Sequence, residues 1–203
     1  MTIAIEANPP TFVPAPSTLK RFTVEQYHTL IQAGGFHPEE RAELLEGWIV
    51  LKVTHNPLHD ATVDQVQEAI RNRLSKDWRI RIQSAVTTTD SEPEPDVVVA
   101  RGPASRYSKN HPGPADIALV VEVADSSLNR DRVEKGPIYA RAGIPEYWIV
   151  NLPESVVEVY SHPVGSGLQA RYPDPGRFTL NDSIPLTIGG QALSPIPVKE
   201  ILP

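Results

Sequence analysis

The stretch "DIALVVEVADSSLNRDRVEKGPIYARAGIPEYWIVN", from Asp116 to Asn151, decides the fold. Apolar residues run almost without interruption through 117–124 and again through 145–151. Continuous apolar runs of this length are typical of strands that are buried on both faces of a sheet. The two ends of the stretch therefore predict two central strands, and whatever joins them must cross over the sheet between them.

The segment between these strands predicts the crossover helix. It reads "SSLNRDRVEKGPIYARAG" over 126–143, where Ser126 or Ser127 can cap the first turn and Gly143 can end the last one. Pro137 should kink this helix, because its ring displaces a bond of the backbone ladder. A strand, a helix and a strand in this order predict an α/β fold.

The flanking sequence predicts the rest of the domain. Further strands are expected at "RIRIQSAV" (79–86), "PDVVVA" (95–100), "SVVEVYSHP" (155–163) and "RFTL" (177–180), and helices at 23–34 and 57–74. "AELLEGWIVLK" (42–52) predicts a hairpin that turns at Glu46-Gly47. We expect a Pro-rich, flexible arm over 1–20, followed over 21–203 by one domain. Its central mixed sheet is flanked by helices and has a strand-rich C-terminal extension.

The composition narrows the functional class. The chain has 203 residues, a net charge of −6 and no cysteine, which excludes disulfides, cysteine-based zinc sites and a thiol nucleophile. The longest apolar run, at 117–121, is too short to span a bilayer, and the N-terminus lacks the basic region of a signal peptide. We therefore expect a cytoplasmic protein with no membrane partner. The acidic balance argues against a broad nucleic-acid footprint but allows a local basic groove, for which "RNRLSKDWRIR" (71–81) is the densest basic segment.

Two acids stand where a buried strand should not hold them. Asp96 opens the strand "DVVVA", and Glu122 lies inside "LVVEVA". A carboxylate in such a strand is costly unless it is paired or binds a metal. Two acids on adjacent strands would suit Mg²⁺ or Mn²⁺, which prefer oxygen ligands. Asp131 and Lys135 share a face of the helix that follows, from which Lys135 could reach the same site.

At this point the residues resemble a known family. Pro95-Asp96, Glu122-Val123, and "DRVEK" leading into "IYARAGIPEYWIVN" resemble the PD-(D/E)XK nuclease superfamily, and more closely its Uma-type branch of restriction endonucleases. The resemblance covers about 22–160. It implies a restriction-endonuclease-like core in which Asp96 and Glu122 bind the metal and Glu46 is the supporting acid. The superfamily lysine stands two residues after the second acid, where this chain has Ala124; the resemblance therefore implies that Lys135 takes that role.

Other polar residues leave alternatives open. His59 is either a core histidine or a residue of the cleft, and Gln83 ends a strand near the site, where it could contact a phosphate. Asp131 is either a helix N-terminal acid, a partner of Lys135 or a direct metal ligand. His55 and His59 are four residues apart, which is a ligand-like spacing, but they lack the glutamate of the HExxH zinc motif.

The sequence thus predicts a Mg²⁺- or Mn²⁺-dependent endonuclease that hydrolyses phosphodiester bonds of DNA and forms a homodimer, as nucleases that cut two strands often do. The alternative is a weak or inactive nuclease-like fold that binds nucleic acid or a protein partner. A third reading is a structural protein whose buried acids are only paired ions.

Overall fold

A six-stranded mixed sheet forms the centre of the computed structural model, which describes residues 18–37, 39–52 and 54–202. All but residues 18–20 of the predicted arm lie outside the described residues. The strands run in the order β3 (Trp78–Ile82), β4 (Val97–Arg101), β5 (Ile117–Ala124), β6 (Glu146–Asn151), β7 (Val156–Ser161), β8 (Gly176–Phe178). Only the β5–β6 pair of this sheet is parallel, and its other pairs are antiparallel. This confirms the predicted α/β class with its central mixed sheet.

The crossover between β5 and β6 is helical, as the sequence predicts, but irregular. It consists of α3 (Leu128–Arg130), a π-helical turn (Asp131–Lys135) and α4 (Gly136–Arg141). In the π turn the N–H of Gly136 donates to the carbonyl of Asp131, five residues back. The wider turn ends two residues before Pro137, whose ring cannot be accommodated in a regular ladder of helical hydrogen bonds. The side chains at the two ends of this turn, Asp131 and Lys135, are both buried.

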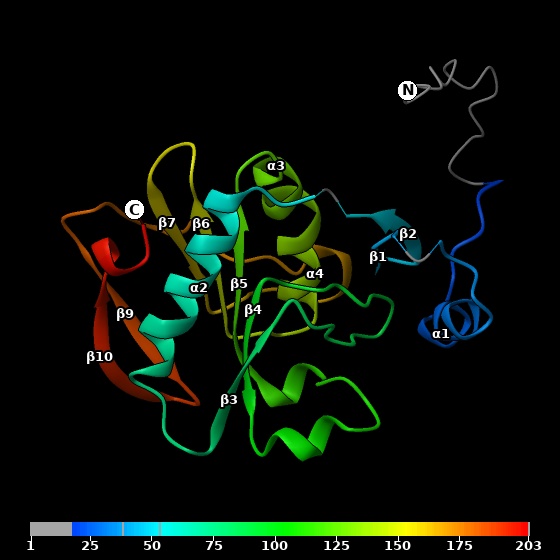
Figure 1. Ribbon diagram of the computed structural model, residues 1–203, viewed down its shortest axis with the longest axis horizontal. Coiled ribbons are helices and arrows are strands. Elements are labelled where there is room, and N and C mark those ends of the chain that lie inside the picture. Colours follow the sequence, from blue (N-terminus) through cyan, green and yellow to red (C-terminus); the bar gives the residue numbers. More distant parts are fainter. Residues whose placement is uncertain (1–17, 38, 53, 203) are drawn as a thin grey trace.

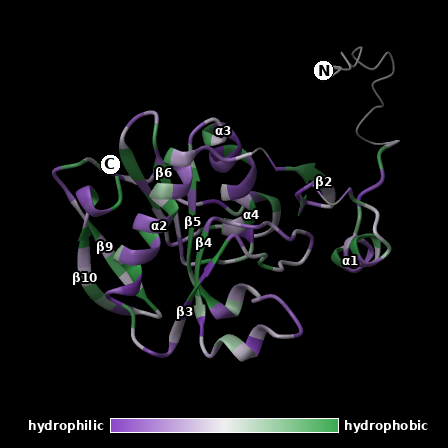
Figure 2. Ribbon diagram, in the orientation of Figure 1, coloured by the Kyte–Doolittle hydropathy of each residue, from purple (hydrophilic) through white to green (hydrophobic). Residues whose placement is uncertain are grey.

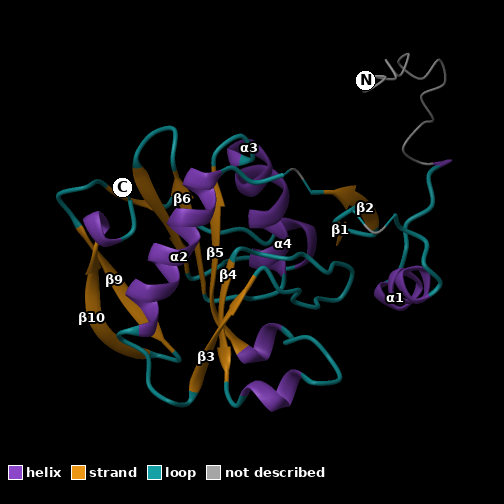
Figure 3. Ribbon diagram, viewed as in Figure 1, coloured by secondary structure: helices purple, strands orange, loops and turns teal. Residues whose placement is uncertain are grey.

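The two faces of the sheet are covered by different elements (Figures 1 and 3). One face packs against α2 (Pro57–Arg71) and the antiparallel hairpin of β9 (Ser183–Ile188) and β10 (Gln191–Pro197). The core on this side contains Val63, Val66, Ile70, Val97, Val121, Trp148, Ile184 and Ile196. The other face packs against α4, and its core contains Val98, Val120, Tyr139, Ile144, Tyr147 and Ile149. Figure 2 shows hydrophobic residues concentrated in the central strands, as expected for strands covered on both sides.

The N-terminal elements form a separate unit of secondary structure beside the sheet (Figure 1). Helix α1 (Val24–Gln32) begins at a capping box formed by Thr23 and Gln26, and β1 (Ala42–Leu45) pairs with β2 (Trp48–Leu51) through the predicted turn. The hairpin docks on the segment just before Asp96, because Leu44 forms a β-bridge with Glu92. This docking brings β1 close to the start of β4.

Short 3₁₀ turns complete the described chain, at Ala104–Tyr107, Pro114–Asp116, Gly167–Gln169 and Val198–Glu200. The last of these docks against the core near the C-terminus, where Val198 and Ile201 are fully buried. Within the described residues, no helix combines the length and apolar character needed to cross a membrane.

Candidate active site

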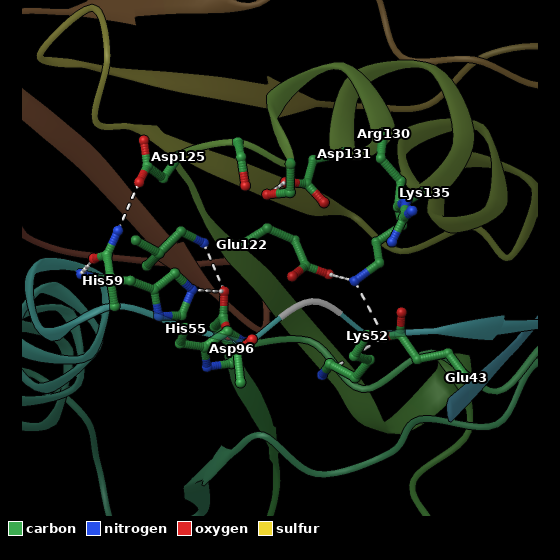
Figure 4. Close-up of a pocket in the computed structure, with 15 residues that line it drawn as sticks. Glu43, Lys52, His55, His59, Asp96, Glu122, Asp125, Arg130, Asp131 and Lys135 are labelled. Atoms are coloured by element: carbon green, nitrogen blue, oxygen red, sulfur yellow. Dashed lines mark hydrogen bonds and ion pairs between the residues drawn. The ribbon is translucent and has the colours of Figure 1, made fainter. Parts of the chain in front are cut away.

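A small cleft opens where the start of α2, the start of β4, the end of β5 and the π turn meet (Figure 4). Its cavity volume is about 80 Å³. The lining is almost entirely polar: Glu43, Lys52, Thr54, His55, Asn56, His59, Asp96, Glu122, Val123, Asp125, Ser126, Ser127, Arg130, Asp131 and Lys135. Five residues that the sequence singles out, namely Asp96, Glu122, Lys135, His59 and Asp131, are therefore brought together in one place.

Two hydrogen-bond donors hold the carboxylate of Asp96, which lies directly before the start of β4. Its Oδ2 accepts a hydrogen bond from the backbone N–H of Val123 at 2.8 Å, and Nε2 of His59 lies 3.2 Å from the same oxygen. Burial alone would raise the pKa of Asp96, but the hydrogen bond and charge of His59 and the Val123 N–H lower it below its ordinary value. Asp96 is therefore an ionised carboxylate, and Oδ1 accepts neither of these two bonds.

Glu122 is the acid whose ionisation costs most. Its Oε1 accepts hydrogen bonds from Nζ of Lys135 at 3.0 Å and from the hydroxyl of Tyr139 at 2.8 Å. Burial, together with the neighbouring carboxylates Asp131 and Asp96, raises the pKa of Glu122 to about 8, against the pull of Lys135. Glu122 lies two residues from Val120 and from Ala124 along β5, so the three side chains point to the same face of the sheet. This face is covered by the helical crossover that carries Lys135.

Lys135 lies between two carboxylates. Its Nζ is 3.0 Å from Oε1 of Glu122 and 3.1 Å from Oε1 of Glu43. Burial by itself would lower the pKa of Lys135, but Glu122, Glu43 and Asp131 outweigh it and raise the pKa above its ordinary value. The side chain is therefore a permanent ammonium cation, unsuited to accept a proton from water.

The structure places Glu43, rather than Glu46, in the cleft. Glu46 occupies the β1–β2 turn with a φ of 49°, and its carboxylate pairs with Arg141 on the far side of the crossover. Glu43 is 1% exposed, holds Lys135, and accepts a hydrogen bond from the backbone N–H of Glu94 at 2.7 Å. A turn residue projects outward, whereas Glu43 lies within a buried strand. The apolar neighbours Leu44 and Leu45 are the signal that could have identified it.

Of the remaining predicted residues, Asp131 lines the cleft and Gln83 does not. Asp131 is buried in the cleft, where its carboxylate accepts a hydrogen bond from the hydroxyl of Ser127 at 2.6 Å. Gln83 does not line the cleft; its amide lies 3.0 Å from Nδ1 of His55, which does. Lys52 and Asp125 line the cleft although neither was singled out from the sequence.

None of the residues of the basic segment 71–81 lines the cleft. Arg71 ends α2, whereas the cleft lies at the start of that helix, about 20 Å away at 1.5 Å rise per residue. Arg73 pairs with Glu200, and the guanidinium of Arg81 lies over the ring of Tyr107. These contacts give the arginines roles within the fold.

The charge balance of the cleft fits a divalent cation. Four buried acids face two nearly buried lysines, which leaves 4 − 2 = 2 negative charges when all of them are ionised: Glu43, Asp96, Glu122 and Asp131 against Lys52 and Lys135. Arg130, at the rim, pairs with Glu134. Oxygen donors with an excess of two negative charges are the environment that Mg²⁺ and Mn²⁺ prefer.

Glu122 should make the metal-free protein lose stability as pH rises. The folded state binds the Glu122 proton more tightly than the unfolded chain does, so this group destabilises the fold progressively from the ordinary pKa of 4.5 up to about 8. In EDTA, we expect the free energy of unfolding of Glu122→Gln to increase relative to wild type by a few kcal/mol between pH 5 and 8, at about 1.4 kcal/mol per unit of pKa shift. Urea unfolding at several pH values measures this difference; parallel curves for the two proteins would contradict it.

Comparisons with known proteins identify the family and the fold of the chain. The model of the family Uma2, described as "Putative restriction endonuclease", matches residues 24–194. The crystal structure of a putative nuclease belonging to DUF820, from Anabaena variabilis ATCC 29413, superimposes with a TM-score of 0.62. It is 19% identical in sequence, and the match covers 89% of this chain and 97% of that chain. At this identity the likeness establishes a shared fold. A search of curated proteins gave no match.

Proposed function

The chain belongs to the Uma2 family of restriction-endonuclease-like proteins, and on this premise we propose that its cleft hydrolyses phosphodiester bonds of DNA with the help of Mg²⁺ or Mn²⁺. The observation that carries the proposal is the pair Asp96 and Glu122, two buried carboxylates at the adjoining ends of β4 and β5, with an excess negative charge around them. A purely structural cluster of buried acids would need as many cations, whereas here four buried acids face two lysines.

Asp96 and Glu122 would hold the metal ion. The ion would supply charge neutralisation at the phosphate and make a nearby water more acidic. The protein prepares both ligands for this role. His59 and the Val123 N–H fix the orientation of Asp96, and Tyr139 and Lys135 fix that of Glu122, so neither carboxylate must reorganise when it is engaged.

Lys135 would stabilise the reacting phosphate. Attack of water forms a new P–O bond and breaks the bond to the leaving oxygen, which takes up a proton, and extra negative charge develops on the phosphoryl oxygens in between. A fixed ammonium at this point stabilises that charge without reorganisation. Glu43 holds Nζ of Lys135 from the side opposite Glu122 and thus acts as a positioning residue. The raised pKa of Lys135 supports this electrostatic role over proton abstraction.

The substrate assignment to DNA follows the restriction-endonuclease description of the family. Arg130, at the rim of the cleft, offers a partly exposed cation to the phosphates that flank the reacting one. To cut both strands of a duplex, two copies of the cleft are needed, which a two-fold homodimer would supply.

Cleavage of DNA tests the proposal. We expect the wild-type protein to nick supercoiled plasmid or cut single-stranded DNA with Mg²⁺ or Mn²⁺, and to leave both intact in EDTA. Glu122→Gln, in the same preparation, should be inactive. A protein that binds the metal but cleaves neither substrate would instead favour the non-catalytic, nucleic-acid-binding alternative, which a gel-shift experiment with the same DNA would reveal.

A further inference from the structure

A second cluster of ligand-type side chains stands at the start of α2, where His55 and His59 line one side of the acidic cleft. The ligand atoms of His55, His59 and Asp60 all lie within 4.8 Å of one another. Oδ1 of Asp60 is 3.3 Å from Nδ1 of His59 and 3.6 Å from Nδ1 of His55. Neither the metal site nor the phosphate chemistry described above uses His55 or Asp60.

The local sequence builds this cluster. Asn56 caps α2 by accepting a hydrogen bond from the backbone N–H of His59 at 2.9 Å, and Pro57 occupies the first turn. The cap folds His55 back over the helix start, so that its ring stacks on that of His59 with centroids 4.0 Å apart. The two imidazoles are thereby held side by side before any ligand arrives.

The proton on His59 is assigned by its other neighbour. Nε2 faces Oδ2 of Asp96 at 3.2 Å, and because an ionised carboxylate can only accept, Nε2 must donate. Nδ1 of the same ring faces Oδ1 of Asp60 at 3.3 Å, so an ion bound between them would contact both groups. A carboxylate that orients a histidine from behind is the usual support of a metal-bound imidazole.

We propose that His55, His59 and Asp60 bind a transition-metal dication of the Zn²⁺ class at the start of α2. Two imidazole nitrogens and one carboxylate oxygen favour such ions over Mg²⁺. The Asp60 side chain is 61% exposed, which leaves room for water ligands. The site is separate from the Asp96–Glu122 pair, and its existence does not depend on nuclease activity.

Two features set the strength of the site. The Gln83 amide lies 3.0 Å from Nδ1 of His55, so a metal bound at this nitrogen must displace that contact. The positive end of the α2 dipole also opposes a cation. The negative charges of Asp60 and Asp96 act in the opposite direction. Together, these opposing effects predict that the site binds the metal ion with moderate affinity.

Calorimetric titration of the full chain with ZnCl₂, in excess Mg²⁺, tests the proposal. We expect one Zn²⁺ per chain in the wild type, and at least ~10-fold weaker binding in both His55→Asn and Asp60→Asn. Glu122→Gln should bind Zn²⁺ as the wild type does, because it alters only the acidic cleft. His111→Asn, a change at an exposed histidine elsewhere, should also leave binding unchanged.

Three results would overturn the proposal. The absence of Zn²⁺ binding would mean that His59 is an imidazolium that donates to both Asp60 and Asp96. Loss of binding in Glu122→Gln would place the ion in the acidic cleft. An equal loss in His111→Asn would indicate unspecific histidine binding. Melting temperatures in EDTA, expected to match wild type for every histidine and Asp60 variant, show that the folds are intact.

Discussion

Lys135→Met should lose phosphodiester cleavage by about 10²-fold or more at saturating Mn²⁺, the size expected for removing one positioned charge from a reacting centre. The substitution keeps the volume of the side chain and removes only the ammonium. It should also destabilise the metal-free protein by about 3 kcal/mol, because Glu43 and Glu122 lose their buried partner. Mn²⁺ should recover part of that stability, and should raise the melting temperature more than it does in the wild type.

Glu134→Ala is the matched control for Lys135. Glu134 precedes Lys135 in the same π turn, but its side chain is 53% exposed. We expect wild-type cleavage and a change in stability within about 0.5 kcal/mol. Equal cleavage by Lys135→Met and wild type, measured on the same plasmid substrate, would remove Lys135 from the chemistry and leave it as a structural cation.

Asp96→Asn should bind Mn²⁺ at least ~10-fold more weakly and cleave DNA about 10³-fold more slowly than wild type, because one anionic ligand is lost. The fold should survive, since the asparagine carbonyl can still accept the hydrogen bond from the Val123 N–H. Mn²⁺ titration followed by melting temperature, together with cleavage rates, measures both effects.

Asp125→Asn makes the same chemical change in the same cleft and serves as the control for Asp96. Asp125 lines the rim, where it accepts a hydrogen bond from the side chain of Asn56 at 2.7 Å. It should keep both Mn²⁺ binding and cleavage close to wild type. Similar losses in Asp96→Asn and Asp125→Asn would mean that the metal lies elsewhere in the cleft.

The sequence predicted the central part of the fold because its signals there are local and strong. Continuous apolar runs marked β5 and β6, and Asn56-Pro57 marked the start of α2. The β9–β10 hairpin was not individually predicted. Pro185 and Pro195 interrupt its strand pattern, and proline normally argues against a strand. A two-stranded hairpin tolerates both, because each strand is an edge strand, and the pairing is irregular between Leu193 and Ile196.

The site was predicted in part, for a similar physical reason. An acid inside a buried strand is a strong local anomaly, which identified Asp96 and Glu122. The position of Lys135 depended on how the crossover packs, and there the family resemblance supplied what the spacing alone could not. Glu43 was missed because Glu46, three residues later, has the same chemistry. Besides the apolar neighbours of Glu43, the docking of the β1–β2 hairpin on the segment before Asp96 distinguishes the two acids.

Diffraction from a crystal of the wild-type protein soaked in Mn²⁺, recorded where manganese scatters anomalously, tests the central claim most directly. We expect an anomalous peak between Asp96 and Glu122. Lys135 should lie no farther from this peak than a contact through one water molecule. A cleft with no peak, or a crystal whose only peak lies beside His55 and His59, would contradict a metal-dependent nuclease site at the ends of β4 and β5.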